Sequence, residues 1–279
     1  MVALLKGFQI DEGNPLVGAS ARVETLQRLG ASLLGNEDVF GKQGRPGGIV
    51  GMYPPINNVA NGPANVADYL TRNGSENLDY AELWAVLQRL LIPIWPSDRT
   101  KVAGKPVGDA WPLSVLSKHE GTATEAVETG TIAPFHKLTQ WLAYSLKVPF
   151  ERLLGSAWTN AELGTGLPEY RNGGLFVDMG VIKLKPEALE RGQRNPGGGK
   201  LPCFGAGDEE IVEWRAMTVA LLDEVHARIS QSGDFGEVRL SLPQVLEAGS
   251  WKAGREIAAE KRPETKSSPI LNSGDGTLF

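Results

Sequence analysis

The stretch DEEIVEWRAMTVALLDEVHARI, residues 208–229, decides the fold class of this 279-residue chain. Its apolar side chains recur at the spacing of an α-helix that buries one face. Asp208 stands at the N-cap position, and Glu209 and Glu210 follow it in the turn where the helix dipole favours negative charge. The apolar face comprises Ile211, Trp214, Leu221, Leu222, Val225 and Ile229. The stretch therefore predicts a long amphipathic helix.

Other stretches show the same period and predict further helices. They are residues 20–34 with Ser20 as N-cap, 79–92 ended by Pro93, 136–147 between Pro134 and Pro149, and 241–247 and 250–260 joined by Ala248-Gly249. Glycine and proline punctuate the segments between them, and the Gly-rich stretch 191–207 is predicted to be a linker loop. Asp275-Gly276 indicates a small C-terminal hairpin. The predicted fold class is mainly α, a single helical domain over residues 1–279 with many Gly/Pro-rich loops.

Composition restricts the classes of function. The chain is 41% apolar and 22% charged, which is typical of a globular protein. Its net charge of −5 disfavours nucleic acid as a partner, because nucleic-acid binding depends on neutralising phosphates. Cys203 is the only cysteine and the 3 histidines stand far apart, so we expect neither a metal nor a cofactor. No stretch approaches the roughly 18 apolar residues that cross a bilayer, so we expect a soluble, cytoplasmic protein without membrane contact.

The helix predicted at 136–147 has two distinct faces. The apolar face holds Leu138, Trp141, Leu142 and Leu146. On the other face, His136, Gln140 and Tyr144 follow one another at intervals of four residues. A solvated face explains such a stripe, but solvated faces are usually rich in Lys and Glu. Side chains that both donate and accept hydrogen bonds also suit ligand binding, and both interpretations stay open.

Arg215 is the unusual residue of the helix predicted at 208–229. It lies about 40° from Ile211 around the helix axis, close to the apolar face. An unpaired buried charge is costly, so the guanidinium must be paired or face a polar cavity. An internal ion pair and a cation that holds an anionic substrate are both consistent with this position.

The polar segment around Glu169 is the best candidate for chemistry. Glu169 and Asp178 are the only carboxylates in residues 166–180. Tyr170, Arg171 and Asn172 surround Glu169 with hydrogen-bond donors. An adjacent arginine should keep the carboxylate ionised, and Gly173-Gly174 would let backbone approach a ligand closely. A surface salt bridge is the structural alternative.

Several long segments resemble, in order, a uracil-catabolism family of fungi and bacteria that was originally defined as a domain of unknown function. The segments include Pro134 to Leu146, Gly166 to Ile182, Val212 to Asp223, Val245 to Ala258 and Ser268 to Phe279. Members of that family usually carry a further N-terminal helical region before the segment that matches Gly7 to Gly18. The resemblance therefore implies an N-terminally shortened member.

The resemblance implies a step on a ribosyl-urea-type or nucleotide-derived intermediate of uracil catabolism, namely hydrolysis of the ribosyl C–N bond. A weaker similarity to queuosine-salvage N-glycosidases implies a fold related to DNA glycosylases. In those proteins an Asp-Tyr-Arg stands where this chain has Glu169-Tyr170-Arg171. The similarity extends to the helical Glu213-x-Arg215.

These resemblances assign a role to each candidate residue. Glu169 would stabilise the positive charge that develops on the sugar and would orient water. Asp178, His136 and Tyr170 are candidates for protonating or hydrogen-bonding the departing urea. Arg171 and Arg215 could hold a 5′-phosphate. The remaining substrate-binding candidates are Gln140, Tyr144, Asn172 and Glu213.

Two alternatives to hydrolysis stay open. One is a non-catalytic binding or scaffold subunit of the same pathway. The other is transfer of the ribosyl group to an acceptor other than water, for which the same carboxylate would serve. The expected partner in each case is a small molecule, and the sequence makes no prediction about oligomeric state.

Overall fold

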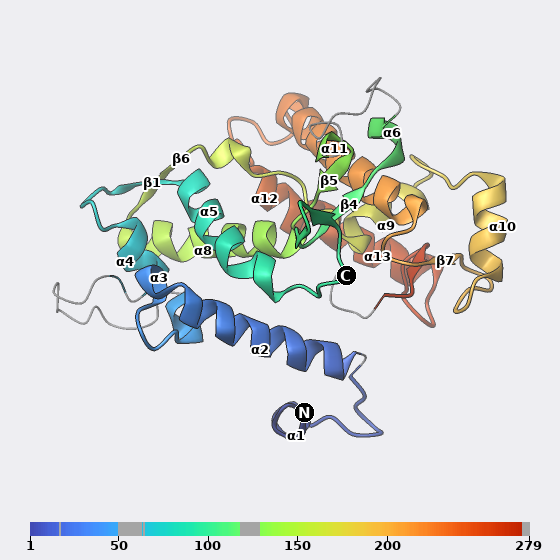
Figure 1. Cartoon of the computed structure of the whole chain (residues 1–279). Helices are drawn as coiled ribbons and strands as arrows, with labels where there is room; N and C mark the ends of the chain where they lie inside the picture. The colour runs from blue at the N-terminus through green and yellow to red at the C-terminus, as the bar shows by residue number, and fades with distance from the viewer. Residues whose placement is uncertain (17, 50–62, 64, 118–128, 275–279) are drawn as a thin grey trace. The chain divides into compact units, whose positions relative to one another are not determined.

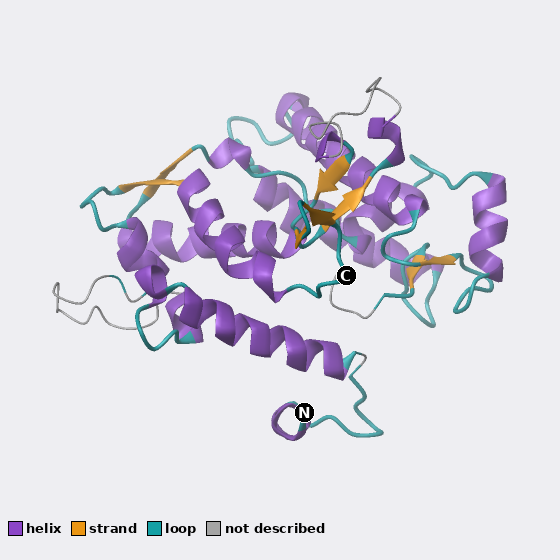
Figure 2. Cartoon of the chain, in the orientation of Figure 1, coloured by secondary structure: helices purple, strands orange, loops and turns teal. Residues whose placement is uncertain are grey.

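The computed structural model describes residues 1–16, 18–49, 63, 65–117 and 129–274. Helices dominate this part of the chain, and its strands are short and form two-stranded ladders (Figures 1 and 2). The prediction of a mainly α fold is therefore confirmed.

The chain groups into two compact units. Unit 1 comprises Met1–Asp109 and Leu138–Gly164, and unit 2 comprises Ala110–Lys137 and Thr165–Phe279. The chain passes between them after Asp109, Lys137 and Gly164. Because the segments of the two units are interleaved, a composition break along the sequence could not reveal them.

Unit 1 is built mainly from the helices that flank α5. Its elements are α1 (Val2–Gly7), α2 (Ala19–Gly35), α3 (Glu37–Phe40), η1 (Pro46–Ile49), α4 (Val66–Leu70), β1 (Asn77–Asp79), α5 (Tyr80–Leu91), η3 (Ile92–Ile94), β2 (Lys101–Val102), β3 (Lys105–Pro106), α8 (Lys137–Leu154, whose first residue belongs to unit 2), β6 (Ala157–Thr159) and η4 (Ala161–Leu163). Leu83, Leu87 and Leu90 of α5 are fully buried, because they recur on one face of the helix. β1 and β6 pair in parallel, with Leu78 opposite Trp158.

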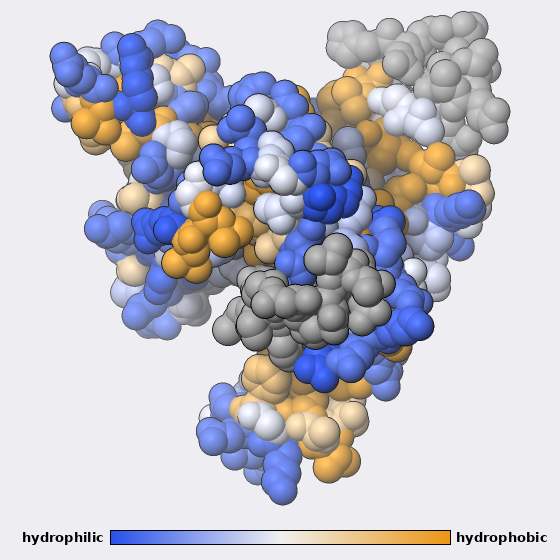
Figure 3. All heavy atoms as spheres, turned by 90° about the vertical axis from the view of Figure 1, so that its left-hand side faces the viewer, coloured by the Kyte–Doolittle hydropathy of each residue, from blue (hydrophilic) through white to orange (hydrophobic). Residues whose placement is uncertain are grey.

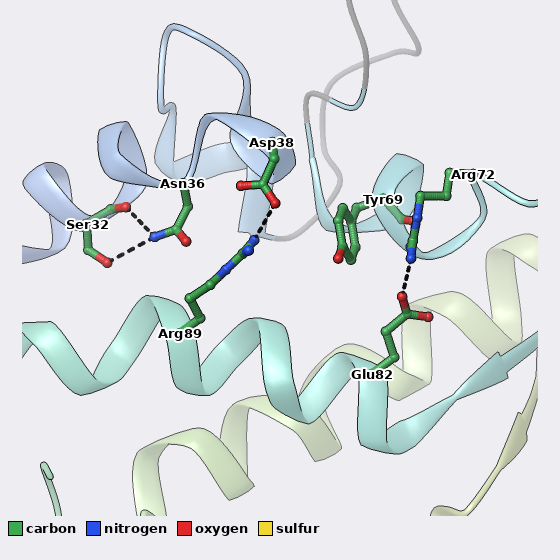
Figure 4. A network of polar contacts seen from close by, with 7 residues as sticks. All are labelled: Ser32, Asn36, Asp38, Tyr69, Arg72, Glu82 and Arg89. Carbon is green, nitrogen blue, oxygen red and sulfur yellow. Dashed lines mark hydrogen bonds and ion pairs between the residues drawn. The ribbon is translucent and has the colours of Figure 1, made fainter.

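Polar contacts join the shorter helices of unit 1 to α5 (Figure 4). Arg72 contacts the carboxylate of Glu82 at 2.5 Å, and its guanidinium lies 4.1 Å from the centroid of the Tyr69 ring. Arg89 of α5 reaches Asp38 of α3 at 2.9 Å. Both ion pairs are solvent-exposed, so each contributes at most about 1 kcal/mol. They orient the short helices more than they stabilise them.

Unit 2 is arranged around α9 and α11. Its elements are β4 (Ala110–Pro112), α6 (Ser114–Ser117), β5 (Ile132–Pro134), α9 (Tyr170–Asp178), α10 (Pro186–Arg194), β7 (Cys203–Phe204), α11 (Glu209–Ser232), α12 (Leu242–Gln244), the π-helix η5 (Val245–Trp251), α13 (Lys252–Lys261) and β8 (Leu271–Asn272). Two buried clusters cover α11. One contains Phe204, Ile211, Trp214 and Ile270, and the other contains Leu113, Ala133 and Val212.

The strongest helix predictions are confirmed. The stretch 208–229 forms α11 with Asp208 at its N-cap position, although the Asp208 carboxylate accepts a hydrogen bond from the Gly205 N–H instead of capping the helix. The stretch 79–92 forms α5, and here the N-cap side chain of Asp79 does accept from the Ala81 N–H, at 2.9 Å. The helix predicted from Ser20 begins at Ala19, so Gly18 is the N-cap and the Ser20 cap was wrong.

The interpretation of α8 was wrong in two respects. The helix does not stop before Pro149 but continues to Leu154. Trp141, assigned to the apolar face, is 54% exposed, whereas Gln140 of the supposed polar face is 3% exposed. Leu146 of the predicted apolar face is buried, but the buried side of α8 also carries polar residues such as Thr139, which donates to the Gln88 side chain of α5 at 2.9 Å.

Two loop predictions also need correction, and a third is untested. Ala248-Gly249 is not a break, because the π-helix η5 joins α12 to α13 without an interruption. The stretch 191–207 is not a linker, because Cys203 and Phe204 are buried and pair in parallel with Leu271–Asn272. The hairpin turn predicted at Asp275-Gly276 lies outside the described residues.

The molecular surface is mainly polar where it can be seen. Figure 3 shows one face on which hydrophilic residues predominate and hydrophobic residues gather in separate places. Leu153, at 80% exposed, is among the most exposed large apolar side chains. Among the described residues, no helix combines the length and the hydrophobicity that a bilayer span requires.

The contact between α9 and α13 leaves no room for a side chain at Gly254. A Cβ atom there would lie 2.1 Å from the carbonyl oxygen of Arg171, a backbone atom that cannot swing away. We therefore expect Gly254→Ala to lower the free energy of unfolding by about 1–3 kcal/mol. Denaturant unfolding curves measure this change.

Gly30→Ala in α2 is the matched control. No atom lies within 4 Å of a Cβ placed at Gly30. This substitution should therefore raise the free energy of unfolding by about 0.5–1 kcal/mol, since alanine is the better helix former. Equal stabilities of Gly254→Ala and the wild type would contradict the close packing of α9 on α13.

Candidate active site

Glu169 occupies the N-cap of α9. Its backbone is extended, with φ −122° and ψ 157°, as is usual for a residue that precedes a helix. The Arg171 N–H donates to its carboxylate oxygens, at 2.9 Å to Oε1 and 2.6 Å to Oε2, and the Asn172 N–H donates to Oε1 at 3.3 Å. The carboxylate thus satisfies two of the N–H groups that every helix start leaves unpaired. These bonds fix the position of the Glu169 carboxylate at the start of α9.

Burial raises the pKa of Glu169 above its ordinary value. The backbone N–H groups of Arg171 and Asn172 oppose this rise, followed by the positive charges of Lys137 and Arg171. The sequence predicted that Arg171 would keep the carboxylate ionised, but its charge is the smallest of these influences and desolvation outweighs it. Glu169 is therefore protonated at higher pH than an exposed glutamate would be.

Glutamate is an unusual choice for this cap. Serine, threonine, aspartate and asparagine are the preferred N-caps. Desolvation of a charged group is costly, so a cap alone does not explain Glu169. Carboxylates whose pKa is shifted by burial cluster at functional sites, and together with its capping geometry this makes Glu169 the leading candidate of unit 2.

Arg215 of α11 lies beside the same segment. Its side chain is 1% exposed, its Nε donates to the Pro168 carbonyl at 3.3 Å, and its guanidinium lies 4.3 Å from the Phe135 ring centroid. Pro168 immediately precedes Glu169, so this buried arginine connects α11 to the residue before the cap. Its assignment to a substrate anion stays a prediction.

Tyr170 and Arg171 begin α9 on its more exposed side. The Arg171 guanidinium lies 4.7 Å from the Tyr170 ring centroid, and its Nη1 donates to the Lys266 carbonyl at 2.8 Å. Tyr170 also packs against the buried cluster around Phe204 and Trp214. These contacts fix the orientation of both side chains.

Asn172 is buried in the first turn of α9, with 1% of its surface exposed. Its Oδ1 accepts a hydrogen bond from the Ser250 hydroxyl at 2.8 Å. Its Nδ2 donates to the Leu167 carbonyl at 3.5 Å. Both polar atoms of the Asn172 side chain are therefore bonded to protein groups, one in η5 and one in the segment before Glu169.

Asp178 lies at the opposite end of α9 from Glu169. The rise along a helix places the two residues about 13 Å apart along the axis. The Asp178 carboxylate forms a two-pronged ion pair with Arg262, at 2.8 Å and 2.5 Å, and is 5% exposed. The structure therefore does not bring the two predicted catalytic carboxylates together.

The other predicted site residues are distributed over both units. His136 is half-buried, immediately precedes α8 and has a positive φ of 42°, an uncommon conformation that is a sign of local strain. Glu213 is half-buried on α11 in unit 2. Gln140 and Tyr144 belong to unit 1.

Gly173 and Gly174 do not leave space for a ligand. A Cβ at Gly173 would lie 2.6 Å from the Thr218 hydroxyl, and one at Gly174 would lie 3.1 Å from the Pro269 ring. Both glycines allow close packing inside unit 2. The expectation that they admit a ligand was therefore wrong.

Sequence reasoning missed Lys137 and Ser250. Lys137 adds positive charge near the Glu169 carboxylate, and Ser250 binds Asn172. Lys137 directly follows the singled-out His136, which was the only signal for it. The described residues contain no group of three or more His, Cys, Asp or Glu side chains that could hold a metal ion.

The fold and the site define a mainly helical protein with a half-buried carboxylate that caps the start of one helix. The chain belongs to the DUF1688 family, described as proteins of unknown function, which matches residues 1–279. This match confirms the family resemblance found in the sequence segments.

Two curated relatives match almost the whole chain. Uracil catabolism protein 4 of Lachancea kluyveri is 43% identical over 286 residues, which is 98% of this chain and 60% of the relative. Protein urg3 of Schizosaccharomyces pombe is 45% identical over 275 residues, 98% of this chain and 57% of the relative. The chain thus spans less than two thirds of the length of these relatives. No solved structure matches it, so the likeness to DNA glycosylases stays a prediction.

Proposed function

We propose that this chain acts in uracil catabolism and hydrolyses the ribosyl C–N bond of a ribosyl-urea-type or nucleotide-derived intermediate. The name of the Lachancea kluyveri relative supports the pathway. The observation that supports the chemistry is the Glu169 carboxylate, which is half-buried, is bound by backbone N–H groups and has a raised pKa. We propose the cytoplasm as its location.

In the proposed reaction, the C–N bond breaks with positive charge developing on the sugar. The Glu169 carboxylate stabilises that oxocarbenium-like state and accepts a proton from the attacking water. A raised pKa brings the carboxyl closer to neutral pH, where a general base transfers protons most effectively. Side chains can supply both functions, so the proposed reaction is metal-independent.

The departing urea nitrogen must gain a proton. Of the three residues considered for this task, Asp178 is engaged by Arg262 at the far end of α9. We therefore assign the leaving-group side to His136 or Tyr170, each of which can donate a hydrogen bond.

A 5′-phosphate on the substrate would need a cation that solvent can reach. The Arg215 side chain is 1% exposed, so we assign it to hold the Pro168–Glu169 segment. Arg171 makes its bond to Lys266 at the surface and is the better candidate for a phosphate. Glu213 stays a proposed substrate-binding residue of unit 2. Asn172 is 1% exposed and accepts from Ser250, so by the same criterion we assign it to hold the start of α9. The assignments of Gln140 and Tyr144, in unit 1, stay predictions.

One observation favours the alternative of a non-catalytic binding subunit. The ion pair with Arg262 leaves Glu169 without the second carboxylate expected to assist it. Hydrolysis still requires only one carboxylate if a neutral group serves the leaving nitrogen. Measurement of products separates these functions.

The test is a product assay with the purified chain. Ribosylurea and its 5′-phosphate are supplied separately, and free urea and free sugar are quantified. We expect equimolar urea and sugar from at least one of them. Urea without free sugar would indicate ribosyl transfer. If a chain shown to be folded bound either compound without releasing urea, the binding alternative would replace hydrolysis.

A further inference from the structure

A π-helix lies against the start of α9. The segment η5, Val245–Trp251, carries the chain from α12 into α13. π-helices are rare, and they are frequently found at functional sites. The wider turn changes the direction of every side chain that follows it. In this protein it places Ser250, 5% exposed, against α9.

The Ser250 hydroxyl is connected to Glu169 through one residue. It donates to Asn172 Oδ1 at 2.8 Å, while the Leu246 carbonyl, its alternative acceptor, is more distant at 3.5 Å. A serine hydroxyl has one proton to donate, so the shorter bond is preferred. The backbone N–H of Asn172 in turn donates to Glu169 Oε1.

We propose that Ser250 is a positioning residue for the reaction assigned to Glu169, and that the π-helix exists to aim its hydroxyl at Asn172. The Ser250 hydroxyl donates to Asn172 and not to the Glu169 carboxylate, so its effect is transmitted by the first turn of α9. This inference rests on the proposed function for its kinetic consequences. Its effect on the carboxylate itself does not depend on which substrate is used.

Removal of the hydroxyl has a defined physical consequence. Ser250→Ala leaves the buried Asn172 Oδ1 without this donor, which allows the first turn of α9 to relax. A relaxed turn weakens the Asn172 N–H bond to the carboxylate. That bond lowers the pKa of Glu169, so its loss raises the pKa further. Lys137 and Arg171 are the charged groups that also act on the carboxyl, and the substitution leaves both in place.

The first readout is a direct titration. Carboxyl carbons of glutamate labelled with carbon-13 are followed by NMR against pH, with the Glu169 signal assigned by its absence in Glu169→Gln. We expect Ser250→Ala to titrate at higher pH than the wild type and Ser250→Thr, which keeps the hydroxyl, to titrate close to the wild type. The second readout is kcat/KM for urea release against pH. We expect about a 10-fold loss in Ser250→Ala, with the acid limb moved to higher pH.

Ser32→Ala is the matched control. The Ser32 hydroxyl is also buried and donates to a protein acceptor, the Leu90 carbonyl, at 2.7 Å, but it belongs to unit 1. Its loss should lower stability without changing the titration of Glu169. An unchanged Glu169 titration in folded Ser250→Ala would overturn the inference. Absence of urea release with a shifted titration would refute the proposed function and leave the positioning role of Ser250 standing.

Discussion

Glu169→Gln is expected to lower the rate of urea release by about 10²- to 10⁴-fold while the protein stays folded. The amide oxygen of glutamine can still accept from the Arg171 N–H, so the cap persists. The negative charge that stabilises the sugar and deprotonates water is lost. Turnover is measured together with circular dichroism and thermal unfolding, so that a loss of rate is not mistaken for a loss of fold.

Glu169→Asp separates catalysis from capping. Aspartate is a better N-cap than glutamate and keeps the charge, but it withdraws the carboxylate by one methylene. If Glu169 serves only as a cap, this variant should equal or exceed the wild type in stability and keep full turnover. We expect turnover to fall by about 10²-fold, because displacement by about 1 Å from the reacting atoms has that effect.

A comparison of the stability of Glu169→Gln with that of the wild type supplies the control. Burial raises the pKa of Glu169, so its contribution to stability is complete below the ordinary glutamate pKa of about 4.3 and is lost as the pH rises through the raised value. Glu169→Gln should therefore be at least as stable as the wild type at neutral pH. Asp79→Asn changes a capping carboxylate of unit 1 in the same way and should leave urea release unchanged. Near-normal turnover in Glu169→Gln would contradict the assignment of the reaction to this carboxylate.

The long helices could be predicted from local pattern. α5 and α11 combine a regular apolar face with an acidic first turn, and both signals agree over several turns. The buried residues of α8 differ from those that its apolar spacing predicted, because tertiary contacts decided which face is buried. Its Gln140 is buried while Trp141 is exposed. Pro149 was taken as a stop, yet α8 continues through it.

The site was only partly predictable for a related reason. Glu169, Tyr170, Arg171 and Asn172 are consecutive, so the sequence alone showed a polar cluster. The partners of that cluster are distant in sequence, as Ser250 is from Asn172, and only a folded α13 and η5 bring them close. Asp178 was assigned to the same site as Glu169 because the two residues are close in sequence. The helix between them separates the two carboxylates.

The second large effect is expected at the other end of α9. Asp178→Ala should lower the free energy of unfolding by about 3–5 kcal/mol, because it leaves the guanidinium of Arg262 buried without its carboxylate partner. The two side chains are 5% and 14% exposed, so solvent screens the pair little. Arg262 also donates to the Ser267 carbonyl at 2.8 Å, which ties the segment after α13 to the same point. Denaturant unfolding at neutral pH measures the loss.

Two comparisons decide what Asp178 does. Glu224→Ala removes one partner of an exposed ion pair, Arg228–Glu224 on α11, and should change stability by less than about 1 kcal/mol. The double replacement Asp178→Leu with Arg262→Met should recover much of the stability lost in Asp178→Ala, since it removes both charges together. Urea release per folded molecule of the double variant should stay within a few-fold of the wild type. If stability were unchanged and turnover fell by orders of magnitude, Asp178 would be a catalytic acid after all, because an ion pair that only supports the fold cannot act on the rate alone.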